Sequence, residues 1–126
     1  MNLSGNSLPK GAERESEKII VIHDDLDLPL GEMKIIFNRG DGGHKGVRDI
    51  IQKLKSKNFI QIKIGVCPAS EGKCFKPEKN HRNHYLTARK FTKKEWEKIE
   101  KLAPAVADAL EIILKSGVEK AMNKFN

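Results

Sequence analysis

The stretch FIQIKIGV (59–66) constrains the fold more than any other part of the chain, because its apolar and polar residues alternate. Side chains of a β-strand point alternately to its two faces. Gln61 and Lys63 therefore share one face, and four branched apolar residues share the other. These apolar residues are Ile60, Ile62, Ile64 and Val66. The pattern predicts a strand whose apolar face packs against a core.

Two more strands are predicted N-terminal to this one. IIVIH (19–23) is a continuous run of apolar, mostly β-branched residues, which is typical of a buried parallel strand. The segment DDLDLPLG (24–31) is predicted to be a loop, because it contains three aspartates, a proline and a glycine. EMKIIFN (32–38) is the second strand candidate, and RGDGG (39–43) is predicted to be a turn.

Helical spacing of apolar residues marks two other regions. A helix is predicted from Gly43 to about Lys57, where the apolar residues recur every three or four positions. They are Val47, Ile50, Ile51 and Leu54. Thr92 with Glu95 predicts a capping box at the start of a long amphipathic helix that ends near Gly117.

Two features divide the C-terminal region further. Pro104 falls inside the long helix and is expected to kink or split it. Ser116 with Glu119 could cap a short final helix, VEKAMNKF. Strands that alternate with helices predict an α/β fold, with a mixed, partly parallel sheet flanked by helices. The segment 67–83, rich in lysine, is predicted to be an extended polar loop.

The charge of the chain points to a polyanionic partner. Lysine and arginine number 24 against 17 aspartates and glutamates, so the formal net charge is +7. Nucleic acid is the commonest partner of such a surface, although a merely solvated cationic surface is the alternative. No apolar run approaches the ~20 residues of a membrane-spanning helix, and the N-terminus lacks the order of a secretory signal. We therefore expect a cytoplasmic protein, with an organelle as the alternative location.

The acidic segment HDDLD (23–27) follows a predicted buried strand, at the edge of a sheet where α/β proteins bind ligands. Three interpretations remain open for it. The carboxylates could bind a divalent metal, or one could orient a histidine and stabilise its charged form. The third interpretation is a solvated acidic loop.

The glycine-rich segment GDGGHKG (40–46) precedes the predicted helix, where backbone N–H groups often meet anions. Its spacing matches neither a Walker loop nor a Rossmann fingerprint. A structural turn that caps the helix and an anion-binding or catalytic site are therefore both open. Basic residues surround this segment, and phosphate contact is favoured over a solvated helix face. They include Lys34, Lys45, Arg48 and Lys63.

Cys67, Cys74, His81 and His84 form a candidate zinc site by residue type. Their spacing argues against it, because six residues separate the two cysteines. Two cysteines are also too few for a disulfide framework, which favours a reducing, intracellular compartment. We expect neither a metal nor a cofactor.

Five segments together resemble the bacterial-type peptidyl-tRNA hydrolase family. They are MNLSG (1–5), VIHDDLDLPLG (21–31), GGHKGVRDII (42–51), FIQIKIGV (59–66) and GVEKAMNKFN (117–126). The resemblance covers nearly the whole chain but only the C-terminal two-thirds of the family domain. It therefore implies a single, incomplete domain over residues 1–126 that lacks the N-terminal third.

The resemblance implies metal-free hydrolysis of the ester between peptide and tRNA, which recycles tRNA. Asp24 matches the aspartate that holds the family's catalytic histidine, which itself lies in the N-terminal third. Asn2 matches an asparagine that positions water or substrate, and His44 matches a second, substrate-side histidine. Gly43 and Lys45 adjoin His44 in the implied substrate site, where Lys45 replaces a family asparagine. The implied tRNA contacts are Lys34, Lys45, Arg48 and Lys63.

Two functions follow from these residues. The first is a peptidyl-tRNA hydrolase, with tRNA as its partner, no membrane contact and a monomeric state. The second is a non-catalytic derivative that binds tRNA or other RNA and has lost the catalytic histidine segment. Neither His23 nor His44 is an obvious substitute for the missing base.

Overall fold

The computed structural model describes residues 19–70, 73–74 and 91–126. A three-stranded sheet lies at its centre, with strand order β1-β3-β2. Strand β1 (Ile20–Pro29) runs parallel to β3 (Ile60–Cys67), and β2 (Met33–Phe37) runs antiparallel to β3. The sheet is therefore mixed and partly parallel, as the sequence predicted.

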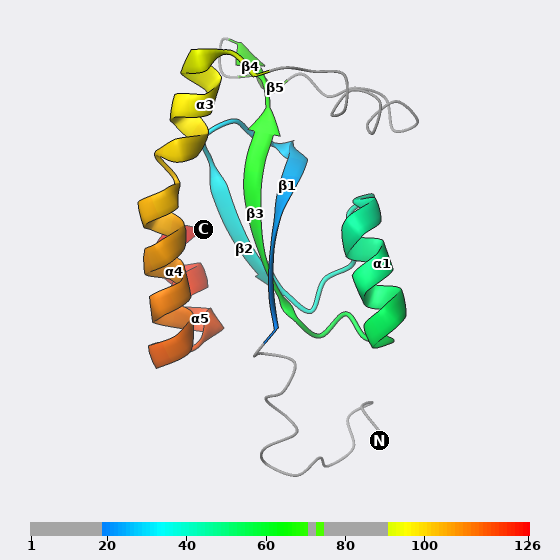
Figure 1. The fold of residues 1–126 in the computed structure, drawn as a ribbon. Coiled ribbons are helices and arrows are strands. Elements are labelled where there is room, and N and C mark those ends of the chain that lie inside the picture. Colours follow the sequence, from blue (N-terminus) through cyan, green and yellow to red (C-terminus); the bar gives the residue numbers. More distant parts are fainter. Residues whose placement is uncertain (1–18, 71–72, 75–90) are drawn as a thin grey trace.

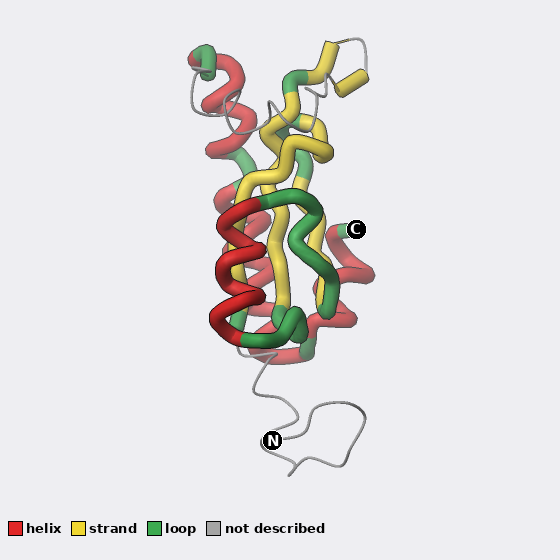
Figure 2. Tube along the Cα trace, turned by 90° about the vertical axis from the view of Figure 1, so that its right-hand side faces the viewer, coloured by secondary structure: helices red, strands yellow, loops and turns green. Residues whose placement is uncertain are grey.

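Helices cover both sides of this sheet (Figure 1). Helix α1 (Lys45–Leu54) lies on one side, while α4 (Ala103–Ser116) and α5 (Val118–Phe125) lie on the other. The view turned by 90° shows the same three layers, with α1 in front of the strands (Figure 2). The prediction of an α/β fold with flanking helices is confirmed.

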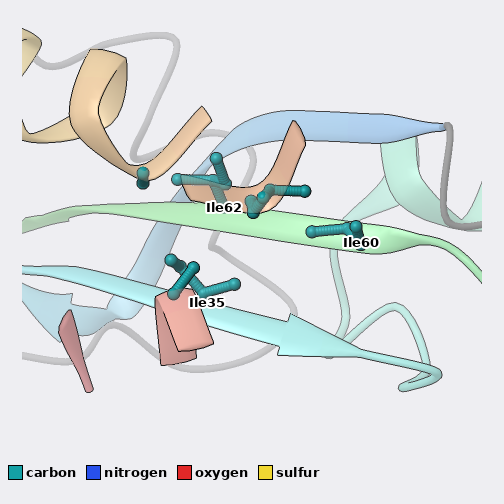
Figure 3. Packing of buried hydrophobic residues seen from close by; sticks show 6 residues of the cluster. Ile35, Ile60 and Ile62 are labelled. Atoms are coloured by element: carbon teal, nitrogen blue, oxygen red, sulfur yellow. The ribbon is translucent and has the colours of Figure 1, made fainter. Parts of the chain in front are cut away.

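The core lies between the sheet and helices α4 and α5. Ile60 and Ile62 of β3 and Ile35 of β2 have no exposed surface, and all three face this layer (Figure 3). Ile35 and Ile62 are register partners, so their side chains lie on the same face. Residues of the two helices complete the cluster: Ala109, Ile113 and Ala121. The apolar face of the alternating stretch therefore forms the side of the core that the sheet provides.

The other face of the sheet, which we call the polar face, points toward α1 and carries polar side chains beside the buried Ile36. The register places His23 beside Lys63 and Lys34 opposite Lys63. Gln61, which precedes this lysine by two positions, lies on the same face and is completely buried. The alternation predicted two chemically different faces, and the structure has them.

Strand β1 corrects the predicted boundaries. The acidic segment 24–31 was expected to be a loop, but β1 continues through it to Pro29. The pairing with β3 is regular as far as Asp25 and Gly65, then shifts before Pro29 pairs with Cys67. Gly65 permits this close crossing, because a Cβ there would lie 1.9 Å from the carbonyl oxygen of Pro29. The missing side chain on β3 lets an acidic, proline-containing segment stay in the sheet.

The prediction of a polar loop over residues 67–83 is wrong for the first residues of that segment. Two short strands, β4 (Ala69–Ser70) and β5 (Lys73–Cys74), pair there in antiparallel orientation. The remainder of the predicted loop falls outside the described residues.

The C-terminal helices follow the sequence signals with one exception. Thr92 and Glu95 form both hydrogen bonds of the capping box at α3 (Lys93–Glu100). Pro104 lies in the first turn of α4, so the predicted long helix is split there. The proposed cap by Ser116 is wrong, because Gly117 is the N-cap of α5 and makes no side-chain cap bond. In the described part of the chain, no helix is long and apolar enough to span a membrane.

Candidate active site

The first element of the candidate site is a direct contact between Asp24 and His44. The Nε2 atom of His44 lies 2.9 Å from Oδ1 of Asp24. The other ring nitrogen, Nδ1, accepts the backbone N–H of Val47 at 3.2 Å. Because Nδ1 accepts, the proton of a neutral His44 ring must lie on Nε2 and point to the carboxylate. Asp24 thus fixes both the tautomer and the orientation of His44.

The position of His44 follows from its place at the start of α1. It is the N-cap residue, with extended backbone angles, and its side chain satisfies one N–H of the first helical turn. Gly46 leaves room for the ring, because a Cβ there would lie 3.0 Å from Cε1 of His44. The glycine-rich segment therefore caps the helix and also places an imidazole in a site. The two interpretations left open for this segment are compatible.

The loop before His44 is braced by Asp41. Its Oδ1 accepts the N–H of Gly43 at 2.7 Å, and its backbone oxygen accepts the N–H of His44 at 2.8 Å. Its Oδ2 lies 3.2 Å from Nε of Arg48. The hydrogen bond from Gly43 and then the Arg48 guanidinium hold the pKa of Asp41 below its usual value of 3.8. The loop is thus fastened by a carboxylate that its neighbours keep ionised.

A second ion pair lies beside the first on the polar face. The Nζ atom of Lys63 is 3.4 Å from Oδ2 of Asp25, and the side chains are only 21% and 15% exposed. Asp25 also accepts the backbone N–H of Asp27 through Oδ1. Both oxygens of this carboxylate therefore contact groups of the protein. The carboxylate neutralises the charge of Lys63, whose amine lies close to Gly42. The acidic segment is neither free in solvent nor a loop.

The predicted tRNA-contact residues differ in their surroundings. Lys34 and Lys45 are exposed, and Lys34 lies across the sheet from Lys63. Arg48 is about half exposed and contacts Asp41, whereas Lys63 is mostly buried and contacts Asp25. Lys34 and Lys45 are therefore the two of the four with the most accessible charge. The other two also serve as internal ion-pair partners.

Sequence reasoning missed Gln61 as a part of this site and considered His23 only as a substitute for the missing base. The rings of His23 and His44 meet edge to face, with centroids 4.7 Å apart. His23 also contacts Gln61, the one completely buried polar side chain among the described residues. The alternation of β3 was the one sequence feature that pointed to Gln61, because it placed this residue on the same face as Lys63. Its burial depends on residues distant in sequence and was not foreseen.

Several predicted site residues are not brought into this arrangement. Asn2 lies outside the described residues, as do His81 and His84. Cys67 is disulfide-bonded, so its sulfur is not a thiolate ligand, and the candidate zinc site is not supported. Within residues 19–70, 73–74 and 91–126, no three potential ligand side chains gather to hold a metal ion. Of the three interpretations of HDDLD, the carboxylate that orients a histidine is the one that the geometry displays.

Comparison with known proteins gives a consistent result. The profile of the family described as peptidyl-tRNA hydrolase matches residues 1–126. A peptidyl-tRNA hydrolase of Clostridium perfringens is 40% identical over 129 residues, which cover all of this chain and 63% of that protein. One of Thermodesulfovibrio yellowstonii is 40% identical over 131 residues and is covered to 65%. The chain thus spans slightly less than two-thirds of the length of these relatives.

A solved structure shares the fold. The crystal structure of peptidyl-tRNA hydrolase from Acinetobacter baumannii superposes with a TM-score of 0.73 and 25% sequence identity. The match covers 93% of this chain and 55% of that one.

Proposed function

The chain belongs to the peptidyl-tRNA hydrolase family, and on this basis we propose that it takes part in hydrolysing the ester bond between a peptide and tRNA. Water adds across this ester, the peptide leaves as a carboxylic acid, and the ribose oxygen of tRNA regains a proton. The contact between Asp24 and His44 is the observation that carries the proposal. A carboxylate that accepts the N–H of an imidazole fixes the tautomer and the orientation of that ring, which a histidine that positions the substrate needs.

The geometry restricts what His44 does in its observed position. Nε2 donates to Asp24 and Nδ1 accepts from Val47, so neither ring nitrogen is available to take a proton from water. We therefore assign His44 to the substrate side, together with Gly43 and Lys45. Asp24 orients the imidazole of His44, and within the described residues no contact occupies its second carboxylate oxygen, which can receive a further donor. Asn2 completes the proposed set by positioning water or the substrate.

The proposed tRNA surface is the polar side of the sheet and the start of α1. Exposed Lys34 and Lys45 supply the accessible positive charge there, with Arg48 and Lys63 at its border. Phosphate contacts of this kind give binding that weakens steeply as salt concentration rises. We propose tRNA as the partner and the cytoplasm as the location, and a monomer as the working form without metal or cofactor.

Hydrolysis of an N-blocked aminoacyl-tRNA by the purified chain tests the proposal. We expect Asp24→Asn to lower the rate by about 10²-fold, because Asp24 orients an imidazole and a misplacement near 1 Å has a cost of this size. Asp49→Asn is the matched control, because this exposed carboxylate lies on α1 and, among the described residues, pairs only with Lys53. Equal rates for wild type and Asp24→Asn would remove Asp24 from the mechanism.

Binding to deacylated tRNA across a salt series tests the partner separately. Lys34→Gln should reduce the salt dependence by about one phosphate contact. Lys115→Gln should leave the salt dependence unchanged, because α4 lies on the other side of the sheet and Lys115 pairs with Glu111 on that helix. Salt-sensitive binding without turnover would favour the non-catalytic RNA-binding alternative. An affinity for tRNA that did not change with salt concentration would contradict both functions.

A further inference from the structure

Gln61 connects three segments of the polar face through hydrogen bonds. Its Nε2 atom donates to the backbone oxygens of Arg39 and Gly40, both at 3.2 Å. Its Oε1 atom lies 2.9 Å from Nε2 of His23. The side chain has no exposed surface, so these bonds are made without competition from water. One buried amide thus joins β3, β1 and the loop that leads into α1.

The two backbone oxygens determine how this amide is oriented. They only accept hydrogen bonds, so the NH₂ group of Gln61 must face them and Oε1 must face His23. Nε2 of His23 therefore has to donate. The other ring nitrogen, Nδ1, lies 2.7 Å from the backbone oxygen of Asp24, which is also only an acceptor. Only a ring with a proton on both nitrogens satisfies both contacts.

The same bonds reach the two segments that carry Asp24 and His44. Asp24 follows His23 directly on β1, and His44 lies at the end of the loop between β2 and α1, which contains Arg39 and Gly40. The His23 ring also packs against the His44 ring at 4.7 Å. Within the described residues, the titratable groups around His23 are Asp24, the Asp25–Lys63 pair and His44. Gln61 is therefore bonded to both segments that the Asp24–His44 contact brings together.

We propose that Gln61 is a positioning residue: it holds His23 as a double N–H donor and fastens the loop at Arg39 and Gly40, so that His44 stays on Asp24. The expected effect on hydrolysis rests on the proposed function, whereas the geometric claim does not. Gln61 does not touch the reacting atoms in this scheme. It acts through His23 and through the loop.

Nitrogen-15 NMR of the histidine rings in the full chain, near neutral pH, tests the geometric claim. In the wild type, we expect a proton on both ring nitrogens of His23 and a proton on Nε2 alone of His44. Gln61→Met removes the amide at similar length, so His23 should lose the doubly protonated pattern and His44 should average between tautomers. Because the chain has four histidines, the His44→Asn and His23→Asn variants together assign the signals of these two rings.

A second variant separates the two halves of the amide. Gln61→Glu keeps an acceptor for His23 but cannot donate to the backbone oxygens of Arg39 and Gly40. We expect the His23 pattern to persist while that of His44 changes, and this variant decides the question if Gln61→Met does not fold. Gln52→Met, at an exposed glutamine of α1, is the matched control and should reproduce the wild-type spectrum.

The proposal is overturned if wild-type His23 has only one protonated ring nitrogen, or if both Gln61 variants leave the His44 pattern unchanged. In hydrolysis, Gln61→Met should slow turnover by about 10- to 100-fold, the scale of a misplacement near 1 Å. A wild-type chain without any turnover would count against the proposed function, while the ring spectra would still decide the role of Gln61.

Discussion

Gln61 and Ile62 are neighbours on β3 and neither has any exposed surface, yet they are buried by different chemistry. Ile62 faces helices α4 and α5 among other apolar side chains. Gln61 faces the opposite side and is satisfied by directional hydrogen bonds. The free energy of apolar packing depends on the area removed from water and not on direction, whereas hydrogen bonds also fix angles and tautomers. The first face therefore supports the fold, and the second can orient a site.

The difference predicts that the apolar face is the more sensitive to truncation. Ile62→Ala would leave a cavity at the centre of the middle strand, where Ile35 is its register partner. We expect the free energy of unfolding to fall by about 2–5 kcal/mol. Urea unfolding of the full chain measures this loss. Since a domain of this size is stable by only about 5–15 kcal/mol, the variant should unfold at a markedly lower temperature.

Leu114→Ala is the matched control for this prediction. Leu114 lies on α4, near the same layer, but 79% of it is exposed. Its truncation should change the free energy of unfolding by no more than about 0.5 kcal/mol. If the two variants lost equal stability, the cluster around Ile62 would not be the main core.

The polar face should lose less stability and more function. His44→Ala removes the N-cap of α1 and should lower the free energy of unfolding by about 0.5–2 kcal/mol. His44→Asn restores a good capping residue but has no imidazole to meet Asp24. We expect Asn to recover most of the stability, as measured by urea unfolding, without recovering the ring contact.

This pair of variants separates the two tasks of His44. The glycine-rich segment was open to a structural and a functional interpretation because both need the same residues. If His44→Asn were as unstable as His44→Ala, the contact with Asp24, rather than the cap, would be the main stabilising role of the ring.

The local pattern of the sequence was sufficient for the two faces but not for the ends of the strands. Alternation over residues 59–66 identified β3 and divided its side chains correctly. The continuation of β1 through the aspartates was missed, because it depends on the close approach of Pro29 to Gly65. Such an approach joins segments far apart in the chain. Local turn chemistry, which predicted a loop there, was overridden by pairing in the sheet.

The site was predictable as a set of residues and not as an arrangement. Asp24 and His44 were both candidates, but the resemblance assigned Asp24 to another histidine and did not predict their contact at 2.9 Å. Gln61 was read only as a member of the polar face. Its burial requires His23 and the backbone of Arg39 and Gly40, which approach from other segments. A polar residue in an alternating strand carries no local sign of such partners.

The smallest expected effect concerns Asp41, at the border of the polar face. Its pKa is lowered in the folded chain, first by the N–H of Gly43 and then by Arg48. A lowered pKa means that the folded state favours the ionised carboxylate. The resulting stability is fully present above the unfolded pKa, near 3.8, and is lost as the pH falls through the folded value.

Asp41→Asn keeps an acceptor for Gly43 but removes the charge. We expect it to be less stable than the wild type by at most about 1 kcal/mol near neutral pH, and equally stable once Asp41 is protonated in the folded wild type. Urea unfolding of both proteins from about pH 6 to about pH 2.5 measures the difference. A difference that stayed constant with pH would mean that Asp41 fastens the loop by its hydrogen bond alone. The polar face would then owe its order at this border to directional bonds rather than to charge, as at Gln61.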